Sequence, residues 1–137
     1  MTLGLNWDLN DAVDPEFGAR FADALASEGL LGLRDVLTDE VNWHVTGAGP
    51  LSGTYQGTAA VIELLTGMRA QGIRFLPFDT LVSDAHCGLL LVYERDTPGG
   101  KQSAYGMWLM HVDDGKAGEC FWYVEDPEAF ARLLAGI

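Results

Sequence analysis

Basic side chains are scarce in this sequence. Lysine and arginine together number 8 against 20 aspartates and glutamates, which gives a formal net charge of −12 at pH 7. Nucleic acids and anionic membrane surfaces are bound through clustered basic side chains that displace the counterions of phosphates. The composition therefore predicts neither as a partner. The acidic excess is expected to keep the protein soluble, or to attract a cationic ligand at long range.

Metal-binding and disulfide patterns are also missing. Cys87 and Cys120 have no C-x-x-C spacing, and His44, His86 and His111 fall on separate segments without H-x-x-x-H spacing. Neither a bound metal nor any other cofactor is expected. The two cysteines are predicted to be buried, reduced thiols, which suits the cytoplasm. His86 and His111 are expected at the surface.

Long apolar runs are absent as well. Residues 1–10 hold neither a basic region nor an apolar stretch of seven residues, so no signal peptide is expected. No segment approaches the roughly 20 apolar residues of a membrane span. We therefore expect a cytoplasmic protein with no membrane association.

The remaining features are those of one ordinary domain. A length of 137 residues and a hydrophobic fraction of 48% fit a single globular unit with its own core. No boundary interrupts the chain. We predict one domain over 1–137, with 1–13 as an irregular N-terminal arm.

The hydrophobic period changes near Gly72, from about 3.6 residues to 2. Before it, the pattern predicts helices over 15–27, 30–37 and 59–71 and a strand over 41–46, with Asp14 and Thr58 as N-caps. After it, strands are predicted at 73–83, 87–95, 102–112 and 116–125, then a helix capped by Asp126. Short turns join these strands in an antiparallel meander, so the fold class is α+β with helices on one face of the sheet.

Two motifs in the first half resemble a known family. The run from Val41 to Gly47 (VNWHVTG) and the run from Pro50 to Gly57 (PLSGTYQG) resemble the SnoaL-like branch of the nuclear transport factor 2-like superfamily. The opening stretch 21–33 and the hairpin 112–116 do so too. The resemblance implies a curved, cone-shaped antiparallel sheet with helices on its concave face enclosing a pocket. The superfamily includes ketosteroid isomerases, polyketide cyclases, dehydratases, epoxide hydrolases and binding modules without catalysis.

His44 is the first candidate for catalysis. It resembles the position of the catalytic aspartate in ketosteroid isomerases, at the end of the first strand, and imidazole can exchange protons near neutral pH. If His44 faces the cone, Asn42 does too and Trp43 points away. Asp79 matches an aspartate common in the family and is expected either to orient His44 or to have the structural role of satisfying a turn or an arginine.

The other candidate site residues are apolar. Trp108 and Trp122 resemble positions that carry polar catalytic groups in the isomerases and cyclases, and Phe21 replaces a tyrosine of the isomerases. Neither of those two reactions is therefore expected in its usual form. The two indoles are expected to fill the core or to clamp a flat ring or a cation. The expected substrate-binding set is Phe21, Asn42, Trp108, Met110, Cys120 and Trp122.

Two functional hypotheses follow. One is a cofactor-free enzyme of isomerase, cyclase or dehydratase type that acts on an apolar or aromatic substrate with His44 as acid or base. The other is a small-molecule-binding module with an aromatic pocket and no turnover. In either case a homodimer is expected through the outer sheet face, which carries Tyr105, Met107, Leu109, Phe121 and Tyr123.

Overall fold

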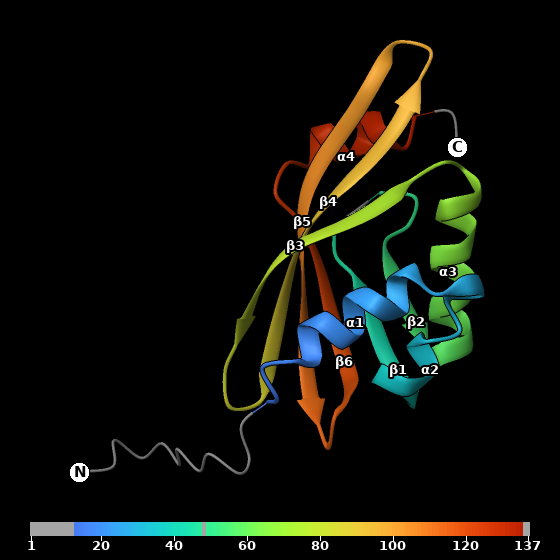
Figure 1. Ribbon diagram of the computed structural model, residues 1–137. Helices are drawn as coiled ribbons and strands as arrows, with labels where there is room; N and C mark the ends of the chain where they lie inside the picture. The colour runs from blue at the N-terminus through green and yellow to red at the C-terminus, as the bar shows by residue number, and fades with distance from the viewer. Residues whose placement is uncertain (1–12, 48, 136–137) are drawn as a thin grey trace.

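A computed structural model describes residues 13–47 and 49–135, so the predicted arm over 1–13 lies almost wholly outside the described residues. Figure 1 shows a curved sheet with helices against one face. The elements are α1 (Phe17–Ala26), the 3₁₀ turn η1 (Glu28–Leu30), α2 (Leu33–Val36), β1 (Leu37–Val45), β2 (Gly53–Gln56), α3 (Thr58–Ala70), β3 (Arg74–Val82), β4 (His86–Thr97), β5 (Gly100–Asp113), β6 (Lys116–Val124) and α4 (Pro127–Leu133).

The sheet has six strands in the order β2-β1-β6-β5-β4-β3. Strands β3 to β6 form the predicted antiparallel meander, and helices α1, α3 and α4 contact the sheet from its concave side (Figure 1). The predicted α+β class is confirmed. Two details differ: β1 pairs with β6 in parallel, and the short strand β2, which the sequence pattern did not predict, pairs with β1 as a hairpin.

Two of the three predicted helix caps need correction. The Asp14 carboxylate accepts a hydrogen bond from the amide of Glu16 at 2.9 Å, within a turn that precedes α1. The Thr58 hydroxyl donates to the carbonyl of Thr38 at 2.7 Å, so it fastens α3 to β1 and caps nothing. Asp126 is the N-cap of α4, as predicted, and accepts from two amides of the first turn. Within the described residues no helix is long and apolar enough to cross a membrane.

Aromatic side chains fill the concave side of the sheet. Trp43, Trp108 and Trp122 are each fully buried, and the ring centroids of Trp108 lie 5.0 Å from those of both other indoles. Phe21 packs against Trp43 and Trp108 at 6.4 and 6.0 Å. Such edge-to-face and tilted contacts stabilise beyond the area they bury. The interior of the cone is therefore a packed aromatic core.

One hydrogen bond inside this core joins two buried side chains. The indole Nε1 of Trp108 donates to the hydroxyl of Tyr93 at 2.7 Å. Burial raises the pKa of Tyr93 well above its usual value, which keeps the phenol protonated. Gly106 permits the arrangement, because a Cβ there would lie 2.5 Å from the Tyr93 ring.

We predict that Tyr93→Phe lowers the free energy of unfolding by about 1–3 kcal/mol, because it leaves the Trp108 N–H without an acceptor in a dry core. Urea denaturation measures this. Tyr105→Phe is the control, since the Tyr105 side chain is 52% exposed and should change stability by less than about 0.5 kcal/mol. Equal stability of the two variants would contradict the prediction.

Candidate functional site

His44 lies on the convex face of the sheet, so the prediction that it faces the cone is wrong. Strand β1 turns Val41, Trp43 and Val45 inward, where each is buried. Side chains alternate along a strand, so His44 faces out. The physical reason is that only one of the adjacent residues Trp43 and His44 can face the core. Burying the indole of Trp43 removes far more apolar area from water than burying the imidazole of His44 would.

His44 has three partners on the convex face. Its Nδ1 lies 2.9 Å from the hydroxyl of Thr54, its Nε2 lies 3.0 Å from Oε2 of Glu119, and its ring stacks on Phe121 at 4.8 Å. In the neutral imidazole the proton belongs on Nε2, because an ionised carboxylate only accepts hydrogen bonds. Nδ1 then accepts from the Thr54 hydroxyl. The imidazole is 28% exposed and held at both nitrogens.

Like His44, the predicted site residues Asp79 and Asn42 do not lie beside the aromatic cluster. Asn42 shares the outward side of β1 with His44, opposite Glu119 of β6. Asp79 lies on β3, which three strands separate from β1, and its carboxylate accepts from the amide of Thr80 at 2.8 Å. Asp79 is therefore too far across the sheet to orient His44.

The apolar part of the predicted set does come together. Phe21, Trp108 and Trp122 lie in one cluster, and Met110 and Cys120 are fully buried on the same side of their strands. They pack against one another, however, so the predicted single pocket lined by His44 and these rings is not there in the described structure. Burial raises the pKa of the Cys120 thiol well above its usual value, which makes it a poor nucleophile.

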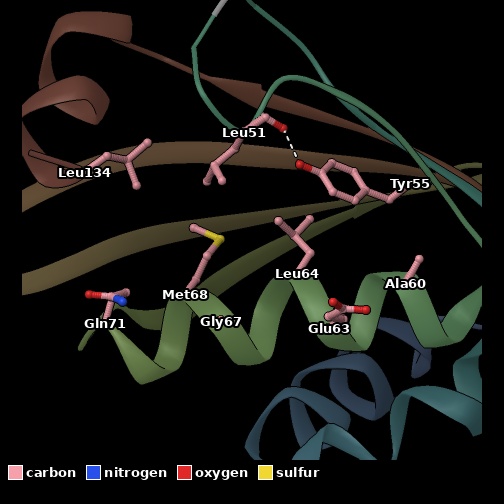
Figure 2. A pocket seen from close by; sticks show the side chains of 9 residues that line it. All are labelled: Leu51, Tyr55, Ala60, Glu63, Leu64, Gly67, Met68, Gln71 and Leu134. Carbon is pink, nitrogen blue, oxygen red and sulfur yellow. Dashed lines mark hydrogen bonds between the residues drawn. The ribbon is translucent and has the colours of Figure 1, made fainter. Parts of the chain in front are cut away.

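Open space lies instead beside α3. A cavity of about 470 Å³, here called the α3 cavity, lies between α3, the start of β2 and the end of α4 (Figure 2). The Tyr55 hydroxyl at its edge donates to the carbonyl of Leu51 at 2.7 Å. The lining consists of Leu51, Tyr55, Ala60, Glu63, Leu64, Gly67, Met68, Gln71 and Leu134.

A second cavity adjoins the first. This strand-end cavity has a volume of about 180 Å³ and lies where β1 and β6 end against α4. Leu51 and Leu134 line both spaces, and Trp122 and Phe130 bring the aromatic core to its wall. The full lining is Val45, Thr46, Gly47, Gly49, Pro50, Leu51, Ser52, Trp122, Val124, Pro127, Phe130, Ala131 and Leu134.

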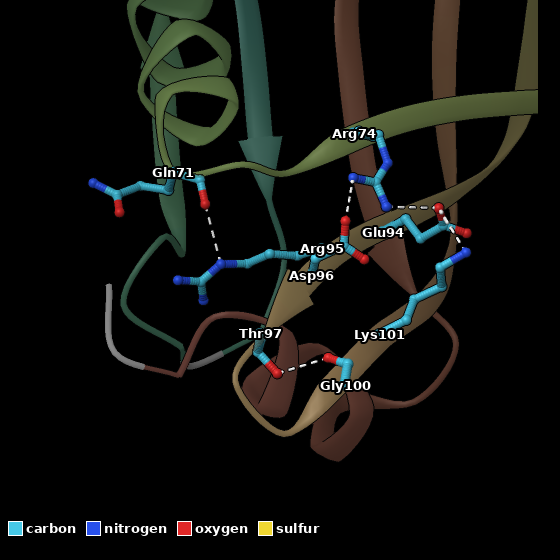
Figure 3. A network of polar contacts seen from close by, with 8 residues as sticks. All are labelled: Gln71, Arg74, Glu94, Arg95, Asp96, Thr97, Gly100 and Lys101. Atoms are coloured by element: carbon cyan, nitrogen blue, oxygen red, sulfur yellow. Dashed lines mark hydrogen bonds and ion pairs between the residues drawn. The ribbon is translucent and has the colours of Figure 1, made fainter.

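An arginine fixes the ends of the two helices that wall the α3 cavity. Arg95 of β4 donates from Nε to the carbonyl of Gln71 at 3.1 Å, as Figure 3 shows. Its Nη1 donates to the carbonyls of Leu133 and Ala135 at 3.0 and 2.9 Å. These carbonyls lie at or just after the C-terminal ends of α3 and α4, where backbone acceptors lack partners within the helix. Arg95 thus sets the spacing of the cavity walls.

The linings of the two cavities are mainly apolar. Among the described residues, Glu63 is the one charged side chain in either lining, and no histidine, cysteine or lysine belongs to it. No group of three metal-ligating side chains occurs among residues 13–47 and 49–135. The cavities therefore suit a mainly apolar ligand. Sequence reasoning missed them because leucines on α3 and α4 are indistinguishable from core leucines until the helices are placed.

Comparison with known proteins identifies the fold. No family model matches the chain, and no curated protein matches it. A Xanthomonas campestris protein with a cystatin-like fold superposes with a TM-score of 0.70, at 21% identity over 84% of this chain and 92% of that one. The structure of a putative SnoaL-like polyketide cyclase from Jannaschia sp. CCS1 superposes with a TM-score of 0.69, at 13% identity over 89% of this chain and 92% of that one.

A third structure with a similar fold contains a bound small molecule. A Catenulispora acidiphila protein with a ketosteroid isomerase-like fold, solved in complex with trimethylamine, gives a TM-score of 0.70 at 12% identity over 88% of this chain and 94% of that one. At these identities the likeness shows the fold alone. The chain has the cystatin-like, nuclear transport factor 2-like fold that SnoaL-like and ketosteroid isomerase-like structures share, as its sequence motifs predict.

Proposed function

We propose that this chain is a small-molecule-binding domain whose ligand occupies the α3 cavity and the strand-end cavity. The observation that carries the proposal is the pairing of two adjoining apolar cavities with a lining almost free of acid–base groups. Ligand sites are usually concave and apolar with few polar groups, and these cavities fit that description.

The negative charge of the chain limits the classes of ligand that can bind. Glu63 lies at the α3 cavity, and the net charge of −12 surrounds it with negative potential. An anionic ligand would be repelled, so we propose an uncharged apolar molecule or an apolar amine. The structure solved with trimethylamine shares the fold and supports an amine as one ligand class.

The buried, unpaired thiols of Cys87 and Cys120 support a reducing compartment such as the cytoplasm.

We predict that Leu51→Trp weakens binding of the neutral fluorophore N-phenyl-1-naphthylamine at least about tenfold, equivalent to about 1.4 kcal/mol. Leu51 lines both cavities, so an indole there fills the space that the probe would occupy. A fluorescence titration measures the dissociation constant.

Leu31→Trp is the matched control for this variant. Leu31 is 59% exposed and lines neither cavity, so the added indole should leave probe affinity unchanged. Near-ultraviolet circular dichroism verifies that both variants fold. Undiminished binding by a folded Leu51→Trp protein would count against the proposed site.

A second candidate function is catalysis by His44 at the convex face. The contact of Nε2 with Glu119 favours it, because a carboxylate that orients one ring nitrogen is the arrangement used in proton transfer; Nδ1 would act as the base after leaving its contact with Thr54. Here His44 would serve as acid or base for an isomerase, cyclase or dehydratase reaction of an apolar or aromatic substrate. The stacked ring of Phe121 gives such a substrate an aromatic surface.

5-Nitrobenzisoxazole tests this second function, since a base that removes its C3 proton breaks the N–O bond and releases a coloured cyanophenolate. If His44 is a catalytic base, His44→Gln should lower the rate about 10²-fold or more. His86→Gln, at the exposed histidine that begins β4, should leave the rate unchanged. Equal rates for the native protein and both variants would eliminate His44 as a catalytic base.

We also propose a homodimer through the convex face. Phe78, Leu81 and Tyr105 are each more than half exposed there, and Phe78 meets Tyr105 edge-on at 6.2 Å. Met107, Leu109 and Phe121 add partly exposed apolar area on β5 and β6. A standard stable interface buries about 800 Å² per partner, which is the area that a dimer through this face would have to cover.

Sedimentation equilibrium should show a dimer for the native protein and a shift toward monomer for Tyr105→Lys, because an ammonium group placed in an apolar interface is costly to desolvate. Leu31→Lys replaces a leucine of similar exposure to Tyr105 that lies away from the sheet, and it should leave the dimer intact. A native protein that stays monomeric at millimolar concentration would overturn the dimer.

A further inference from the structure

A hollow in the convex face of the sheet is walled by aromatic rings. It has a volume of about 310 Å³ and is here called the convex hollow. Its rings come from three strands: Phe78 of β3, Tyr105 of β5 and Tyr123 of β6. Its lining shares only Val124 with the strand-end cavity and no residue with the α3 cavity, so the hollow is a separate site.

The three rings are open to solvent. Phe78, Tyr105 and Tyr123 are 59%, 52% and 41% exposed. Phe78 meets Tyr105 edge-on, with ring centroids 6.2 Å apart. Tyr123 pairs with Met107, so it is the diagonal neighbour of Tyr105, and aromatic side chains at diagonal positions are within reach of one another. The rings thus border one hollow and remain available to a ligand.

A carboxylate belongs to the same wall. The amide of Glu125 donates to the carbonyl of Tyr105 at 2.9 Å, which places Glu125 beside β5 directly after the end of β6. The lining contains no lysine, arginine or histidine, and among the described residues no basic side chain forms an ion pair with Glu125. The net charge of −12 adds negative potential. The hollow is therefore complementary to a cation.

Aromatic walls select one kind of cation. The negative face of an aromatic ring attracts an ammonium group, and several rings together recognise quaternary ammonium groups. Such a group has no N–H whose hydrogen bonds with water would be lost on binding, so its desolvation costs less than that of a primary amine. Its methyl groups can also pack against the apolar side chains of Leu90 and Met107 in the same lining.

We infer that the convex hollow binds a small organic cation with a quaternary ammonium group, held by the rings of Phe78, Tyr105 and Tyr123 and by the charge of Glu125. This site is independent of the ligand proposed for the α3 cavity and the strand-end cavity. It lies in the face proposed for the homodimer, so the cation and a partner subunit would compete for Phe78 and Tyr105.

Two probes of the same shape test the inference. Choline has a charged nitrogen where 3,3-dimethylbutan-1-ol has a quaternary carbon. Titrations followed by nuclear magnetic resonance should show choline binding at least about tenfold more tightly, and its N-methyl protons should move upfield beside the aromatic rings. Leu81→Asn is titrated beside the native protein, because it weakens a dimer through this face without changing the lining.

Two pairs of variants assign the preference to the hollow. Tyr123→Leu removes a ring and should weaken choline binding about 3- to 10-fold, whereas Tyr123→Phe keeps the ring and should bind as the native protein does. Glu125→Gln removes the charge and should weaken binding by a factor of about the same size. Glu40→Gln removes an exposed carboxylate of β1 outside the lining and should leave choline binding unchanged.

Two results would overturn the cation site. One is equal affinity for choline and the alcohol, or no binding of either, in both the native protein and Leu81→Asn. The other is a choline preference that survives both Tyr123→Leu and Glu125→Gln, which would place the cation elsewhere. Neither result bears on the binding function proposed for the α3 cavity, which is tested separately with N-phenyl-1-naphthylamine.

Discussion

The inward packing of Trp43 determines which side of β1 faces the core. Its ring contacts Phe21, Trp108 and Trp122, so one side chain joins α1 to β1, β5 and β6. Turning β1 over would expose this large ring and bury the imidazole of His44 in its place. The cost in apolar area lost and polar area buried makes that alternative unstable. The position of His44 is thus a consequence of its neighbour.

Because indole rings fill the interior of the cone, the open space lies at its margin. Trp108 and Trp122 occupy the middle of the concave face, and the cavities lie beyond them, toward α3 and α4. The walls there come from the chain that follows β1, from α3 and from the end of α4. Arg95 ties carbonyls at the C-terminal ends of both helices to β4. A site so built depends on spacing between elements more than on any one functional group.

Much of the fold could be read from the sequence, because period and turn chemistry are local signals. The change of period near Gly72, the Asp113-Asp114-Gly115 turn and the Asp126 cap each depend on a few adjacent residues. The inward sides of β5 and β6 were also correctly predicted, with Trp108 and Trp122 buried. The parallel pairing of β1 with β6 and the short strand β2 depend on tertiary contacts, which no local pattern encodes.

The site was harder to predict than the fold, because alternation along a strand leaves two choices of face. A motif that contains Trp43 and His44 as neighbours is compatible with either, and the family likeness favoured the wrong one. The prediction that Asp79 could orient His44 failed for a related reason. The register of β3 shifts between Pro77 and Asp79, and β3 lies at the opposite edge of the sheet, three strands away from β1. The two cavities had no sequence signal either. They form only where α3 and the end of α4 meet the chain that follows β1, and a leucine that lines them, such as Leu64 or Leu134, has the same local pattern as a core leucine.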